Sequence, residues 1–223
     1  MSKRKSQAST LTAHQINKIF SRIRLMSNPH QKAAIIALSL SGLRVTELSR
    51  ITVKDLVMGS GEIRTEIALR AAITKGCKPR QVWLSERTRL ILQTYINHRI
   101  ENNQGTSLGG EYQGLNPKSC FILSGKGYPY QLKAKHRTMI DGTVNTYFAA
   151  DSVELLIREL YKRSGLGGAS SHSGRRSLAS NMNRANVPLK TIARCLGHSQ
   201  VETTLLYIEI SPEQLSKAAL LAF

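Results

Sequence analysis

The residues LGHSQVETTLLY at positions 196–207 decide how the rest of the chain is interpreted. They join a Leu-Gly-His triplet to a Thr-Thr-x-x-Tyr segment, and Tyr207 follows His198 by nine positions. A single tyrosine among apolar neighbours is most often a packing residue. The meaning of this segment therefore depends on the polar residues that accompany it elsewhere in the chain.

Three segments upstream carry side chains that can neutralise a phosphodiester or transfer protons around it. They are SGLRVTEL at 41–48, TKG at 74–76 and HSGR at 172–175. Arginine holds its charge at any working pH and offers a planar fork of donors to phosphate oxygens. Arg44 and Arg175 are thus candidates for binding a phosphate.

The charge balance favours a nucleic acid as the partner. The chain has 32 Lys+Arg against 14 Asp+Glu, a formal net charge of +18, which a polyanion would offset. A membrane surface or an acidic protein is the alternative, but only 5% of residues are aromatic and no basic amphipathic helix has an aromatic face. No apolar run is long enough to cross a bilayer. We expect a soluble, cytoplasmic and nucleoid-associated protein that contacts no membrane.

Hydrophobic spacing and capping signals predict a mainly α fold with a small antiparallel β-sheet. Residues 1–10 are polar and predict a flexible basic arm that includes Lys3, Arg4 and Lys5. Strands are expected within 63–84, on either side of a turn at 75–79, and near 120–123. Residues 102–119 indicate a long loop, and the basic stretch with Lys133, Lys135, His136 and Arg137 has no clear assignment.

Helices are expected at about 13–26, 29–42, 46–51, 85–100, 151–164, 173–185, 188–196, 202–208 and 211–223. Capping boxes are expected at Thr12 with Gln15, Asp151 with Glu154, and Ser199 with Glu202.

Taken together, the order, spacing and neighbours of these segments resemble the catalytic domain of the tyrosine recombinases, the phage integrase type. The resemblance covers about residues 11–210. It implies that family's fold, with one catalytic domain over 11–223 whose C-terminal helix spans about 211–223. That helix is either part of the core or, as in related recombinases, a segment that docks on a neighbouring subunit.

The resemblance also implies a role for each residue in the motifs. Arg44 and Arg175 would clamp the scissile phosphate, while His198 donates to it. Tyr207 would attack the phosphorus to form a 3′-phosphotyrosyl link, with His172 as the base. Lys75 would protonate the departing 5′ oxygen, and Lys78 on the same turn is the alternative acid or a phosphate contact. Glu47 would orient the cationic groups without reacting. The chemistry would need neither metal nor ATP, because the link stores the bond energy.

The three cysteines, Cys77, Cys120 and Cys195, are widely scattered, so we expect reduced thiols and neither a disulfide nor zinc. The chain departs from the family at two positions in one motif. Gly174 stands where leucine is usual, and Arg176 where histidine is usual. After Tyr207 the usual tail is replaced by Ile208-Glu209-Ile210. Few residues precede the resemblance, which indicates either a naturally short enzyme, similar in layout to fimbrial-switch invertases, or a fragment without the N-terminal domain.

The expected partners are double-stranded DNA, a homo-tetramer assembled on it, and an accessory DNA-bending protein. Basic residues outside the motifs are candidate phosphate contacts: Lys3, Arg4, Lys5, Lys78, Lys133, Lys135, Arg137 and Arg176. Two other functions use the same residues. A type IB topoisomerase would relax DNA without exchanging strands between partners, and a non-catalytic regulator would bind DNA without cutting it.

Overall fold

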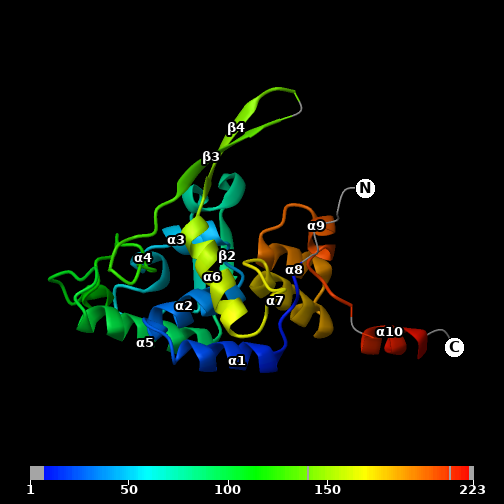
Figure 1. Cartoon of the computed structure of the whole chain (residues 1–223), viewed down its shortest axis with the longest axis horizontal. Helices are drawn as coiled ribbons and strands as arrows, with labels where there is room; N and C mark the ends of the chain where they lie inside the picture. Colours follow the sequence, from blue (N-terminus) through cyan, green and yellow to red (C-terminus); the bar gives the residue numbers. More distant parts are fainter. Residues whose placement is uncertain (1–7, 140, 211, 221–223) are drawn as a thin grey trace.

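The structure is a computed structural model that describes residues 8–139, 141–210 and 212–220, without the side chains of Lys75, Glu213, Lys217 and Ala218. Lys3, Arg4 and Lys5 lie outside the described residues. A helical body carries a projecting β-hairpin, and a short helix lies at its C-terminal end (Figure 1). Within the described ranges no helix combines the length and apolar character needed to cross a bilayer. The helices are α1 (Ala13–Ile23), α2 (Pro29–Leu40), α3 (Val45–Arg50), α4 (Val53–Leu56), α5 (Glu86–Glu101), α6 (Asp151–Arg163), α7 (Ser173–Arg184), α8 (Leu189–Leu196), α9 (Val201–Leu205) and α10 (Pro212–Ala219).

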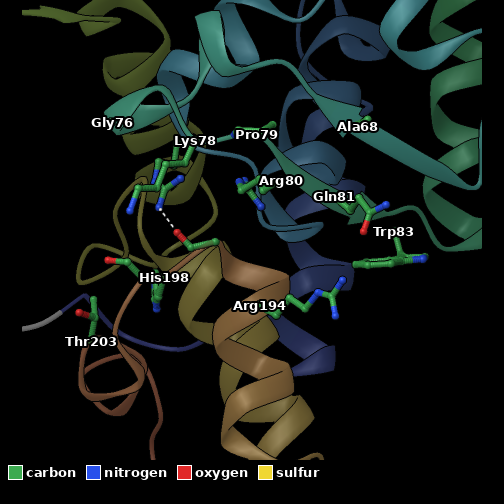
Figure 2. A pocket seen from close by; sticks show the side chains of 13 residues that line it. Ala68, Gly76, Lys78, Pro79, Arg80, Gln81, Trp83, Arg194, His198 and Thr203 are labelled. Carbon is green, nitrogen blue, oxygen red and sulfur yellow. Dashed lines mark hydrogen bonds between the residues drawn. The ribbon is translucent and has the colours of Figure 1, made fainter.

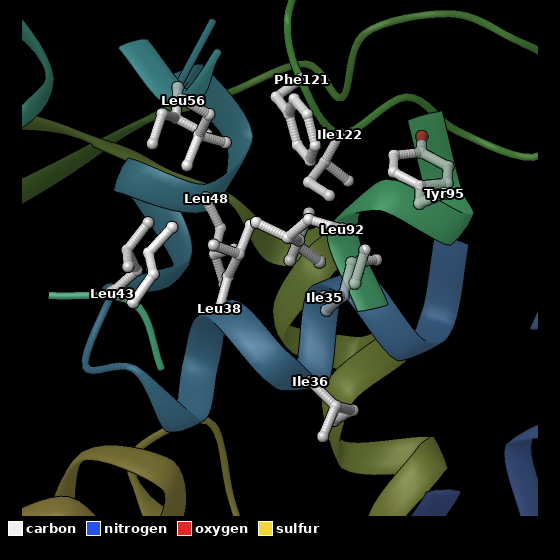
Figure 3. Close-up of a cluster of buried hydrophobic side chains, with 14 of the residues drawn as sticks. Ile35, Ile36, Leu38, Leu43, Leu48, Leu56, Leu92, Tyr95, Phe121 and Ile122 are labelled. Carbon is white, nitrogen blue, oxygen red and sulfur yellow. The ribbon is translucent and has the colours of Figure 1, made fainter. Parts of the chain in front are cut away.

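The central element of the body is α2. Its residues 34–39 are all buried, and a helix that is buried all round needs neighbours on every side. Helices α1, α3, α5 and α7 pack against it. Ile35 and Leu38 of α2 lie beside Leu92 of α5 in the main core (Figure 3).

A second, smaller core joins α7 to α8. Ala179 of α7 packs with Ile192 and Leu196 of α8, and the partly buried Tyr207 and Ile208 cover this cluster.

Gly174, near the start of α7, explains how closely this unit approaches α2. A Cβ at that position would lie 2.6 Å from the backbone oxygen of Ser39, which cannot move aside. The leucine that is usual in the family would not fit here.

The strands form two separate two-stranded antiparallel sheets, so the predicted fold class is confirmed. The first pairs β1 (Glu66–Leu69) with β2 (Arg80–Trp83). Their connection includes the 3-10 turn Lys75–Cys77, within the predicted turn, and a second 3-10 turn, Ala71–Ile73, where a strand was expected. The second pairs β3 (Lys133–Thr138) with β4 (Val144–Ala149) and accounts for the basic stretch that had no assignment. The strand expected at 120–123 is wrong, because that segment forms only isolated bridges at Cys120 and Leu123.

Helix boundaries confirm some capping signals and correct others. Thr12 and Gln15 form the predicted capping box at α1. The boxes at Asp151 and Ser199 are wrong: the N-cap residues are Ala150 and Gln200, and neither makes a side-chain cap. Asp151 is instead the first residue of α6 and accepts a hydrogen bond from Lys135 at 2.7 Å. Three further differences are smaller. Helix α1 ends at residue 23 and α9 at residue 205, both earlier than predicted, and the loop at 102–119 contains a 3-10 turn, Glu111–Gly114.

Candidate active site

Arg44 is the N-cap residue of α3, directly after the turn that ends α2. Gly42 takes a φ of +91° in that turn, a conformation that favours glycine. The Arg44 amide donates to Glu47 Oε2 at 2.7 Å, and its guanidinium Nη1 donates to Oε1 at 3.0 Å. Glu47 is fully buried, so its carboxylate fixes the direction of the Arg44 side chain.

A second guanidinium, from a residue outside the sequence motifs, occupies the centre of the site. Arg80, the first residue of β2, donates to Glu47 through Nε at 3.2 Å and through Nη2 at 2.6 Å. The same Nη2 donates to the Gly42 carbonyl at 2.8 Å. Arg80 and Val82 both lie on the buried face of β2. A cation on the buried face of a strand indicates a buried partner.

Glu47 remains ionised between these two arginines. Burial on its own would raise the pKa of the carboxyl group. Hydrogen bonds and charge attraction from Arg80 and Arg44 more than offset burial and hold the pKa of Glu47 below its usual range. The carboxylate is thus a fixed negative charge beneath the cationic surface.

The C-terminal end of α8 binds three arginines, one at each of three consecutive carbonyls. Arg80 donates to Cys195 O at 3.1 Å, Arg175 to Leu196 O at 2.7 Å, and Arg44 to Gly197 O at 3.3 Å. The last carbonyls of a helix have no intrahelical partner and carry the negative end of the helix dipole. Backbone carbonyls at the Leu-Gly-His turn therefore bind the three guanidinium groups.

Gly197 makes this arrangement possible. It takes the left-handed conformation, with φ +63°, that ends α8. A Cβ at this position would lie 2.3 Å from Arg80 Cδ. Only glycine allows both the turn and the close approach of the buried arginine.

Arg175 extends from α7 into the same cluster. Its Nη1 donates to the Gly42 carbonyl, which also accepts from Arg80. Arg80 therefore links the two predicted phosphate-binding arginines, through the Gly42 carbonyl on one side and Glu47 on the other. Burial, together with repulsion from Arg44 and Arg80, lowers the pKa of Arg175 to about 9, which leaves it cationic at neutral pH. Three guanidiniums and one carboxylate give the cluster a net charge of +2.

His198 accepts a hydrogen bond from this cluster. Arg175 Nη2 has only hydrogens to offer, so His198 Nε2, 3.2 Å away, is the acceptor. His198 Nδ1 then carries the proton toward Thr204 Oγ1 at 2.9 Å. Burial and the positive charges of Arg175, Arg44 and Arg80 lower the pKa of His198 to about 4, so the ring is neutral at pH 7. Arg175 therefore sets the tautomer, and the fully buried Thr204 accepts the Nδ1 proton.

Tyr207 lies in the turn that follows α9, not within the helix as predicted. Its ring centroid is 4.9 Å from that of His198 and 5.8 Å from Arg175 Cζ. Its hydroxyl is 3.5 Å from His172 Nδ1, the outer limit of a hydrogen bond. Ser180 of α7 holds the backbone here, donating to Tyr207 O at 3.3 Å and accepting from the Glu209 amide at 3.0 Å.

A hollow of about 840 Å³ opens beside these residues, between the β1–β2 connection and the α8–α9 connection. Arg44, Lys78, Arg80 and His198 line it, and Figure 2 shows Arg80 on the β2 side and His198 on the other. The backbone of Lys75 begins the 3-10 turn next to this hollow, but its side chain lies outside the described residues. The rim of the hollow is thus basic on the side of that turn.

The remaining basic candidates fall into two groups. Lys133, Lys135 and Arg137 all lie on β3, where Lys133 and Arg137 are exposed. Arg176 is 8% exposed, so it belongs to the interior and not with the exposed basic residues.

Comparisons with known proteins give the same family as the motifs. The family model described as the phage integrase family matches residues 9–214. The chain belongs to the phage integrase family. Tyrosine recombinase XerA of Pyrococcus horikoshii is 24% identical over 214 residues, which are 96% of this chain and 61% of that protein. Tyrosine recombinase XerC of Caldanaerobacter subterraneus subsp. tengcongensis is 28% identical over 189 residues, 83% of this chain and 43% of that protein.

Solved structures confirm the phage integrase fold. The crystal structure of XerA recombinase aligns with a TM-score of 0.69 and 20% identity, over 97% of this chain and 65% of that chain. A post-cleavage complex of XerH site-specific recombinase bound to a palindromic difH substrate aligns with a TM-score of 0.63 and 17% identity, over 96% and 53%. The chain thus spans about two thirds or less of the length of each of these relatives.

Proposed function

We propose that this chain catalyses DNA strand cleavage and rejoining as the catalytic part of a site-specific recombinase. The observation that carries the proposal is the position of Tyr207, whose hydroxyl lies beside His172 while its ring contacts His198 and Arg175. One tyrosine thus lies next to the histidine proposed as the base and the arginine proposed to bind phosphate, although these residues come from separate segments.

In this proposal Arg44 and Arg175 bind the two non-bridging oxygens of the scissile phosphate. As phosphorus becomes five-coordinate its negative charge grows, and a preorganised cluster of net charge +2 stabilises that state more than the ground state. Because Arg80 and the carbonyls of α8 already hold the arginines, little reorganisation is needed when the charge develops.

Tyr207 Oη attacks phosphorus, and its proton passes to His172. The bond from phosphorus to the 5′ oxygen breaks, and Lys75 supplies the proton that the departing oxygen takes up. The 3′-phosphotyrosyl bond then receives attack from a 5′ hydroxyl, which rejoins the strand and releases Tyr207. For His198 to donate to the phosphate as proposed, the Nε2 that now accepts from Arg175 must gain a proton. A nearby phosphate anion favours that change.

The proposed partners are double-stranded DNA and further copies of this chain. Helix α10 supports the second, because it lies at the end of the molecule in Figure 1. Leu215 of α10 is 61% exposed, and Leu220, directly after the helix, is 76% exposed. A helix with exposed leucines gains stability by docking on an apolar surface, here a neighbouring subunit. An accessory DNA-bending protein remains part of the proposal.

The test is covalent trapping on nicked duplexes with a randomised central segment, which lose the cleaved end and so prevent rejoining. The full chain should give a denaturant-stable protein–DNA adduct, with the phosphotyrosyl peptide mapping to Tyr207. Tyr207→Phe should bind the library as well as the parent and give no adduct. An adduct through another residue, or none from the parent under conditions where it binds DNA, contradicts the proposal.

A further inference from the structure

The β3–β4 hairpin has no core of its own. Of the twelve strand positions in 133–138 and 144–149, none is buried. An isolated two-stranded hairpin is at best marginally stable in water. This one projects from the helical body in Figure 1, so its faces are open to a partner.

The two faces of the hairpin differ in chemistry. Alternate residues of a strand point to opposite faces, and the register places Lys133, Lys135 and Arg137 opposite Ala149, Tyr147 and Asn145 on one face. That face, the basic face, carries three cationic residues and no carboxylate. The other face carries Thr138, and His136 pairs there with Thr146 at 2.9 Å.

The hairpin is fixed at the inner half of its basic face. Lys135 Nζ pairs with Asp151 Oδ1 of α6 at 2.7 Å. At the tip, Asp141 Oδ1 accepts from the Thr143 amide at 3.0 Å and from its hydroxyl at 2.6 Å. Between these points lie Arg137 and Asn145, directly opposite each other and both exposed.

We propose that this hairpin lies in the major groove of the DNA substrate and reads its sequence, with Arg137 and Asn145 contacting base edges. This rests on the proposed function. A major groove about 12 Å wide accepts a two-stranded β-ribbon, whose strands lie about 4.8 Å apart. Six residues per strand span about 20 Å, enough to follow the groove across several base pairs.

The chemistry of the two side chains suits base recognition. Arginine pairs with guanine O6 and N7 through two hydrogen bonds, and asparagine pairs in the same way with adenine N6 and N7. Directly opposed side chains in an antiparallel pair have Cβ atoms about 5 Å apart, so they reach neighbouring base pairs. Lys133, nearer the body, is placed to contact phosphates, which positions the ribbon without reading sequence.

Charge favours DNA over a protein as the occupant. The whole chain carries a net charge of +18. The basic face contributes to this charge at alternate positions of β3, on the surface that would face the groove. In Figure 1 the hairpin also extends from the body in the same direction as the β1–β2 connection that borders the active-site hollow. The hairpin and that connection therefore lie on the same side of the helical body in this view.

The test is selection of bound sequences from a duplex library with about 20 randomised base pairs. The parent should enrich a motif. Arg137→Ala and Asn145→Ala should each lose the preference at one or two adjacent base pairs, weakening binding to the enriched duplex by about 5- to 150-fold. Binding to unselected library should change far less. Thr138→Ala, the next residue along β3 and on the opposite face, is the matched control and should keep the motif.

Lys133→Ala separates reading from positioning: it should weaken binding to all sequences alike and reduce the salt dependence by about one phosphate contact. Because the strand residues are not buried, these changes leave no cavity, and thermal melting checks that the chain still folds. A motif unchanged in both Arg137→Ala and Asn145→Ala overturns the proposal. So does a parent that enriches no motif; if that parent still forms the Tyr207 adduct, the proposed function stands and only base reading by the hairpin fails.

Discussion

Replacing Arg80 with methionine tests whether this buried arginine holds the site together. Its side chain is 5% exposed, and it donates to both oxygens of Glu47 and to the carbonyls of Gly42 and Cys195. After Arg80→Met, Gly42 O keeps the hydrogen bond from Arg175, and Glu47 keeps those from Arg44. The buried carboxylate loses its stronger partner, and Cys195 O loses its donor.

Breaking a buried ion pair by removing one partner costs about 3–5 kcal/mol. We expect the free energy of unfolding, measured by urea denaturation at pH 7 with circular dichroism, to fall by about that amount. Arg80→Lys keeps the charge but cannot supply the planar fork to all four acceptors, so it should lose less, about 1–3 kcal/mol.

The double variant Arg80→Met/Glu47→Gln distinguishes the ion pair from a simple packing effect. Once Arg80 is gone, neutralising Glu47 removes an undercompensated buried charge. Glu47→Gln should therefore cost at least about 1 kcal/mol less in the Arg80→Met background than in the parent. Additive losses, or a loss below about 1 kcal/mol for Arg80→Met alone, would refute the view that Arg80 links the two arginines of the site.

Three other predictions concern the same region. Gly197→Ala should destabilise the fold by about 2–4 kcal/mol in urea denaturation, because a Cβ there meets both a left-handed backbone and Arg80 Cδ; an effect below about 1 kcal/mol would contradict this. Ser180→Ala should slow adduct formation by Tyr207 while DNA affinity, measured by fluorescence anisotropy, stays constant; an equal loss of both would assign Ser180 to folding only. His198 has a lowered folded pKa, so its neutral form stabilises the fold fully above about pH 6.5. That stability is lost as pH falls toward 4, and His198→Gln should flatten this part of the thermal stability profile.

The sequence predicted most helices and indicated the motif residues of the candidate site because those signals are local. The step from His198 to Tyr207, the glycine turns and the capping box at Thr12 each depend on a few neighbouring residues. The body around α2 likewise follows from a continuous apolar run. Such patterns survive without knowledge of distant parts of the chain.

The role of Arg80 was not predictable in the same way. It depends on four acceptors that come from α3, the turn before it and the end of α8, and only the fold brings these together. The failed capping box at Asp151 has a similar cause, since Lys135 on β3 competes for its carboxylate. The hairpin was missed because its strands bury nothing, so no apolar alternation marks them.

The carbonyls of α8 explain why the Leu-Gly-His turn and the arginines belong to one motif. Three guanidiniums close together repel one another, and a single carboxylate offsets only part of that repulsion. The helix end supplies the remaining negative potential through three carbonyls that no helical hydrogen bond uses. The arginines are thereby held in place while the cluster keeps its net positive charge. A carboxylate at each of these three positions would hold the arginines equally well, but it would cancel the positive charge that, in the proposed function, binds the scissile phosphate.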